Sequence, residues 1–115
     1  MSRTDGQAWG VRAARIQAVF RAINEELRAS PANGDEDHLR ISCECADPKC
    51  VETLEIDREN YTRMRTDATH FAVLPGHAYP EVELIAAEHS AFVVVEKTGE
   101  AARVAVATDG THRDA

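Results

Sequence analysis

"ISCECADPKCVETLEI", residues 41–56, holds all three cysteines of the chain within eight positions and surrounds them with strand-forming residues. Apolar Leu39 and Ile41 alternate with polar residues, and the alternation continues through Cys43 and Cys45. Because alternate residues of a strand point to the same side, residues 38–45 are predicted to be a strand that presents two thiols on one face. Asp47-Pro48 then predicts a turn, and residues 50–56 a returning strand that begins at the third thiol.

Three converging sulfurs indicate a metal site, because structural zinc is bound by four tetrahedral ligands with zinc–sulfur bonds of about 2.3 Å. The fourth predicted ligand is His77, since the rigid turn at Pro75-Gly76 can direct its imidazole toward a neighbouring strand. We interpret the other histidines as surface or hydrogen-bonded residues; they are His38, His70, His89 and His112. The sequence thus predicts Zn²⁺ held by Cys43, Cys45, Cys50 and His77.

Three alternatives to a metal site stay open for the cysteines. A disulfide would leave an odd thiol and would be reduced in the cytoplasm. A redox sensor would use an exposed, low-pKa thiol beside a resolving partner. The cysteines could also be ordinary buried residues, although three within eight positions make this a weaker interpretation.

The remaining pattern predicts a small α+β domain with a mainly antiparallel sheet. Within residues 9–29, five apolar side chains recur at helical spacing, which predicts an amphipathic helix whose apolar face docks on the domain or on a partner. Those five are Ile16, Val19, Phe20, Ile23 and Leu27. A helix over 58–67 is expected to start at an Asp57 N-cap and to bury Tyr61 and Met64. Further strands are predicted at 70–74, 81–89 and 91–97, with Glu81 and Glu83 on an exposed face, and a last helix at 100–108.

We divide the chain into the N-terminal helix (1–30), a solvated linker (31–38), the metal-binding domain (39–108) and a loose tail (109–115). The chain has 115 residues, 43% of them hydrophobic, which fits one globular domain. No segment has the roughly 20 apolar residues of a membrane span, and the N-terminus does not resemble a secretory signal. We therefore expect a cytoplasmic protein.

Charge disfavours nucleic acid as the partner of the main domain. The net charge is −7, and an acidic surface repels phosphate. Residues 1–30 carry five arginines against three acidic residues, which makes this segment the one candidate for such a contact. We interpret them as the solvated face of the helix, whose apolar side would dock on the domain or on a protein partner.

The motifs "FRAINE" (20–25), "CECADPKC" (43–50), "PGH" (75–77) and "VVEK" (94–97) together resemble a group of small uncharacterised actinobacterial proteins. The similarity covers most of residues 16–100. It implies a zinc site at the three cysteines and His77. It implies no activity.

Two classes of function remain. A closed site with four protein ligands favours a non-enzymatic regulatory or protein-interaction domain, because structural zinc does no chemistry. The alternative is a zinc-dependent hydrolytic enzyme with three cysteines, a water and either Glu44 or Glu52 as general base, or a redox sensor that uses the same thiols. Deaminase, esterase and phosphate-loop motifs are missing from the sequence, so we weigh the binding domain above the enzyme.

Overall fold

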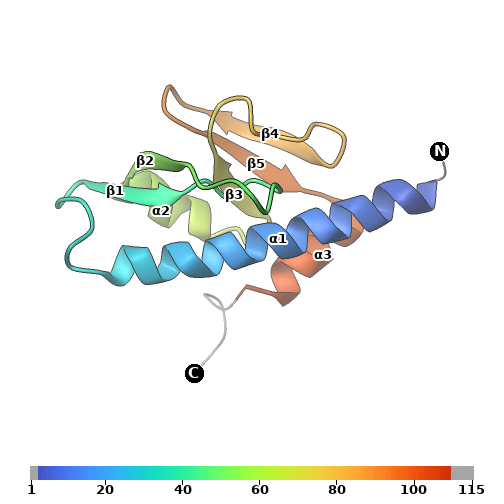
Figure 1. Cartoon of the computed structure of the whole chain (residues 1–115), viewed down its shortest axis with the longest axis horizontal. Coiled ribbons are helices and arrows are strands. Elements are labelled where there is room, and N and C mark those ends of the chain that lie inside the picture. Colours follow the sequence, from blue (N-terminus) through green and yellow to red (C-terminus); the bar gives the residue numbers. More distant parts are fainter. Residues whose placement is uncertain (1–2, 110–115) are drawn as a thin grey trace.

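A long helix, α1 (Arg3–Ala29), runs along one side of the molecule, and the strands lie on the other side (Figure 1). The computed structural model describes residues 3–109. The other elements follow in chain order: β1 (His38–Ser42), β2 (Thr53–Asp57), α2 (Arg58–Arg65), β3 (His70–Val73), β4 (Glu83–Glu88), β5 (Val93–Lys97) and α3 (Gly99–Ala107). None of the helices in this range is both long and apolar enough to cross a bilayer.

The expected α+β class is confirmed, but the strands form two sheets rather than one. β1 and β2 make an antiparallel hairpin, and β3, β5 and β4 make an antiparallel sheet in that order. The predicted strand at 38–45 ends early, at Ser42. Beyond it, Cys43 N donates to Glu52 O (3.0 Å) and Glu44 N donates to Ala72 O (2.8 Å). The cysteine-bearing segment therefore joins the hairpin to the second sheet.

Helix α2 confirms the local prediction made for it. Asp57 is its N-cap, with an extended backbone and a side chain that accepts from Asn60 N. Tyr61 and Met64 are buried as expected. They belong to one apolar core that both sheets share; its larger members are Leu39, Ile41, Leu54, Ile56, Tyr61, Met64, Phe71, Val73, Phe92 and Val95.

The apolar face of α1 does not dock fully on the domain, which was the first of the two predicted alternatives. Val19 and Ile23 are 60% and 42% exposed, and the other three apolar positions are only partly covered. The buried face carries small residues together with the polar residues Gln17, Arg21 and Asn24. Most of these polar groups are paired, since Arg21 donates to Ala105 O (2.9 Å), Asn24 to Ser42 O (2.8 Å) and Gln17 Nε2 to Glu44 O (3.0 Å). Gln17 Oε1 has no hydrogen-bond partner among the described residues. A hydrogen-bonded polar face can be buried without a large penalty, and periodicity of apolar residues does not reveal it.

Glu83 is a second correction. It was expected on an exposed strand face, but it is 3% exposed. Its carboxylate pairs with buried Lys97 (Nζ–Oε1 3.0 Å) and accepts from Gln17 Nε2 and Tyr79 N. The charge is therefore neutralised by a partner from β5, which is distant in sequence.

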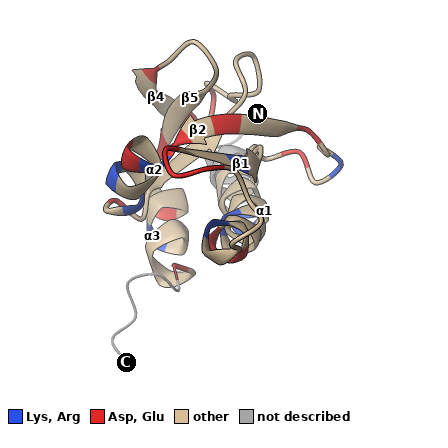
Figure 2. Ribbon diagram, turned by 90° about the vertical axis from the view of Figure 1, so that its left-hand side faces the viewer, with Lys and Arg blue, Asp and Glu red and all other residues tan. Residues whose placement is uncertain are grey.

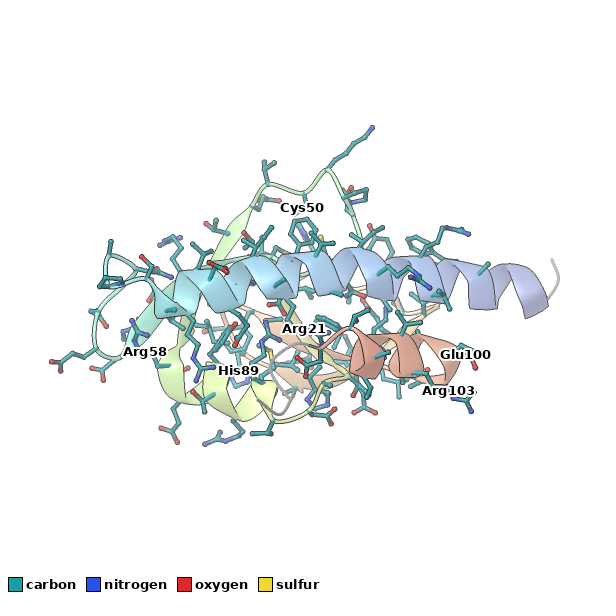
Figure 3. All side chains as sticks on the ribbon, turned by 90° about the horizontal axis from the view of Figure 1, so that it is seen from below. Arg21, Cys50, Arg58, His89, Glu100 and Arg103 are labelled. Atoms are coloured by element: carbon teal, nitrogen blue, oxygen red, sulfur yellow. The ribbon has the colours of Figure 1, made fainter. Side chains whose placement is uncertain are left out.

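The segments outside the regular elements are also held in place. In the predicted linker, the Asn33 side chain donates to Leu27 O and to Arg40 O, both at 3.0 Å. Of the predicted tail, only Asp109 lies within the described residues. Its carboxylate is buried 3.9 Å from Arg21 Nε. In Figure 3, Arg21 lies between α1 and α3, whereas Cys50 lies beyond the opposite edge of α1.

Candidate metal centre

The structure brings together the four residues that the sequence singled out. The ligand-type atoms of Cys43, Cys45, Cys50 and His77 all lie within 4.8 Å of one another. Cys43 and Cys45 are buried, and Cys50 and His77 are partly exposed. All three cysteines are free thiols. The group is thus close enough to hold a metal ion, and its donors suit zinc.

Two short turns deliver the ligands that lie outside the strand junction. At the first, Cys50 N donates to Asp47 O (3.1 Å) and Lys49 N to the Asp47 side chain (2.9 Å), which folds the chain back after Pro48. At the second, His77 N donates to Leu74 O (3.0 Å) across Pro75-Gly76. Gly76 has φ +87°, a conformation that side-chain-bearing residues rarely adopt.

The distances match those of a tetrahedral site. His77 Nδ1 lies 3.6 Å from Cys43 Sγ and 3.8 Å from Cys50 Sγ. In a zinc tetrahedron with zinc–sulfur and zinc–nitrogen bonds of about 2.3 and 2.0–2.1 Å, nitrogen and sulfur are separated by about 3.6 Å. Leu74 N also donates to Cys43 Sγ (3.3 Å), a contact that stabilises negative charge on the sulfur.

The other nitrogen of His77 faces a carboxylate. Nε2 lies 3.4 Å from Glu52 Oε2, and Glu52 is exposed over 62% of its side chain. A proton on Nε2 directed at this carboxylate leaves the lone pair on Nδ1, the nitrogen that faces the sulfurs. Histidine ligands of zinc commonly use such a carboxylate to fix the tautomer.

Glu44 lies between two of the cysteines and serves a role that sequence reasoning missed. It is fully buried and paired with Arg65 of α2. Its carboxylate also accepts from Ala72 N (2.9 Å) and from Asn24 Nδ2 (2.7 Å). Glu44, a residue of the cysteine-bearing segment 43–50 (the metal loop), therefore contacts α1, α2 and β3. The sequence showed only that Glu44 stands between two cysteines. Its spacing to Asn24, Arg65 and Ala72 follows no recognisable pattern, so these partners could not be predicted.

The three thiols differ in acidity. Hydrogen bonding to Cys43, the largest influence, lowers the pKa of Cys45 to about 5 even though the thiol is buried. The same hydrogen bond, together with burial, raises the pKa of Cys43. Burial also raises the pKa of Cys50. At neutral pH the cluster therefore carries one thiolate and two thiols before a metal binds, and a divalent cation would displace the remaining protons.

The remaining described histidines lie apart from this cluster. His38 contacts Asp35, and His89 stacks on Phe92 with ring centroids 4.4 Å apart. His70 Nε2 lies 3.1 Å from Glu96 and 3.4 Å from Asp67, so this histidine contacts two carboxylates. The prediction for His112 falls outside the described residues.

The comparisons add no relative. No family model matches the chain, no curated protein matches it, and no solved structure matches it.

Proposed function

We propose that this chain is a non-enzymatic, zinc-stabilised protein-interaction domain, in which Cys43, Cys45, Cys50 and His77 close the coordination sphere. The observation that carries the proposal is the four-donor cluster, with His77 Nδ1 at 3.6 and 3.8 Å from two sulfurs and Glu52 on the opposite ring nitrogen. Four protein ligands leave no position for a reactive water.

Of the two candidate general bases of the hydrolytic alternative, Glu44 is disfavoured by its surroundings. Both oxygens of Glu44 are engaged by buried donors, so this carboxylate is not free to accept a proton from water. Glu52 contacts His77 on the nitrogen that faces away from the sulfurs. A hollow of about 250 Å³ does border the cluster, lined by Cys45, Asp47, Gly76, His77, Ala78 and Tyr79, so access of an exogenous ligand is worth testing.

The redox alternative is supported by the low pKa of Cys45 but opposed by its burial, because sensor thiols combine low pKa with exposure. A bound metal would also block oxidation of all three sulfurs. A cytoplasmic, reducing location fits three free thiols.

Metal analysis tests the proposal directly. Protein purified under reducing conditions should contain one zinc per chain. Substitution by Co²⁺ should give the absorption of a tetrahedral, sulfur-rich site that does not change on addition of azide or cyanide. A spectrum that shifts with these ligands would establish an open coordination position and favour the hydrolytic enzyme. Reduced protein that contains no metal and stays folded in chelator would remove the zinc centre altogether.

A matched pair of histidine variants tests the ligand assignment. His77→Ala should weaken zinc binding by at least about a hundredfold, because one of four ligands is lost. His38→Ala, in which a half-exposed histidine outside any candidate metal group is removed, should leave the affinity unchanged. Equal zinc affinity for both variants would contradict the role of His77.

A further inference from the structure

The outer face of α1 carries an apolar stripe that no described part of the chain covers. Val19 and Ile23 are 60% and 42% exposed, and Ile16, Phe20 and Leu27 flank them with part of their surfaces in solvent. In the view from below, α1 lies in front of the sheets and its ribbon is uncovered along its length (Figure 3). Apolar residues spaced for one helix face are usually buried against another element. Here that element is absent from residues 3–109.

Two charged residues lie at equal distances from Val19, one on each side of it along the helix. Arg12 lies seven residues before Val19 and Glu26 lies seven residues after it, so the three share one row along the helix. Both charged side chains are exposed, and neither forms an ion pair with a side chain of residues 8–109. At 1.5 Å per residue, each stands about 10 Å from Val19 along the helix axis. In the end-on view of Figure 2, both basic (blue) and acidic (red) segments are visible on α1.

We propose that a second copy of this chain docks on the stripe, so that two α1 helices pack antiparallel across a two-fold axis near Val19. In that arrangement Arg12 of each chain lies beside Glu26 of the other, and the apolar residues between them pack together. A two-fold interface uses the same patch on both subunits, so the patch must be complementary to itself. The row on α1 meets this requirement because Arg12 and Glu26 carry opposite charges at equal distances from Val19.

The charges select both the occupant and its direction. In a parallel pair, Arg12 would face Arg12 and Glu26 would face Glu26, and like charges across an interface are unfavourable. A nucleic acid would meet an apolar stripe flanked by Glu26, and one of the segment's arginines, Arg21, is buried. When the partner is an identical chain, two Arg12–Glu26 pairs form, one at each end of the contact.

The interface is predicted to be small. Arg12 to Glu26 spans about 21 Å of helix, so the contact falls below the roughly 800 Å² per partner of a standard interface. We therefore expect a reversible dimer whose population depends on concentration. This inference deepens the proposed function by naming the partner, yet it does not depend on which metal occupies the cysteine site.

Analytical ultracentrifugation of the full, metal-loaded chain from micromolar to submillimolar concentration tests the proposal. The wild type should show a monomer–dimer equilibrium. Val19→Glu should weaken it by at least about tenfold, since a charge is buried at the axis. Leu84→Glu is the matched control, because Leu84 is similarly exposed (57%) and, as the strand neighbour of Glu83, which contacts α1, it points to the opposite face of β4. The control should dimerise like the wild type.

Charge exchange tests the antiparallel direction. Arg12→Glu alone and Glu26→Arg alone should each weaken the dimer by about tenfold, because each creates two like-charge contacts. The double variant should recover wild-type association. Circular dichroism and zinc content, measured on each variant, separate loss of the dimer from loss of the fold or of the metal. A monomer at every concentration, a dimer insensitive to Val19→Glu, or a double variant without recovery would overturn the proposal.

Discussion

Replacement of Glu44 by Gln is the sharpest test of how the metal loop is held. The carboxylate accepts from Ala72 N and Asn24 Nδ2 and pairs with Arg65, and its side chain is wholly buried. Glutamine has nearly the same shape but offers one oxygen in place of two. Its amide NH₂ must then face a donor, and the guanidinium of Arg65 loses its closest countercharge.

The expected cost follows from the surroundings of that guanidinium. Breaking a buried ion pair destabilises a protein by about 3–5 kcal/mol. Glu25 remains 3.6 Å from Arg65 Nε and is partly exposed, so some countercharge is retained. We expect the lower end, about 3 kcal/mol, which corresponds to a fall in Tm of about 10–20 °C for a domain of this size.

Urea denaturation of the zinc-loaded protein measures this cost, and the exposed pair Arg103–Glu100 supplies the control. These side chains are 80% and 51% exposed at an N–O distance of 2.6 Å. Glu100→Gln should cost no more than about 1 kcal/mol, because solvent screens exposed pairs. If Glu44→Gln costs as little as Glu100→Gln, the buried network does not hold the loop and the reasoning fails.

Three further predictions concern the metal site and the helix cap. Glu52→Gln should weaken zinc binding by about tenfold by loosening the orientation of His77. Glu55→Gln, on the adjoining strand β2, should leave the affinity unchanged, and competition with a chromophoric chelator measures both affinities. Zinc binding at pH 7 should release about two protons, from the two thiols with raised pKa, because Cys45 is already a thiolate at this pH. The contribution of Cys45 to zinc affinity is lost only as the pH falls through about 5. Calorimetry in buffers of different ionisation enthalpy counts the released protons, and a count of none or three would refute the assigned acidities. Asp57→Ala should cost about 1 kcal/mol by removing the N-cap of α2, and an unchanged denaturation midpoint would count against that cap.

Local features of the sequence predicted the parts of the structure that depend on neighbouring residues. The turn at Asp47-Pro48, the cap at Asp57 and the turn before His77 each follow from a few adjacent residues with strong backbone preferences. The metal cluster was predictable for the same reason: two of these turns bring its ligands together. The choice of His77 among five histidines rested on Pro75-Gly76.

The misassigned features depend on partners that are distant in sequence. Arg21 and Asn24 are buried because their acceptors lie on other elements, and Glu83 is buried because Lys97 reaches it from β5. The residues within one helical turn of Arg21, Asn24 and Glu83 do not indicate which distant groups will pair with them. The early end of β1 at Ser42 has the same origin, since Glu44 N donates to Ala72 O on β3 rather than to the hairpin.

The bond between Glu44 and Ala72 also closes one edge of the three-stranded sheet. On that side of β3, Glu44 N donates to Ala72 O, and the Glu44 carboxylate accepts from Ala72 N. Unpaired strand edges invite intermolecular pairing. Loss of the Glu44 carboxylate would loosen the segment that covers this edge, so Glu44→Gln should form β-rich aggregates more readily than the wild type on prolonged incubation.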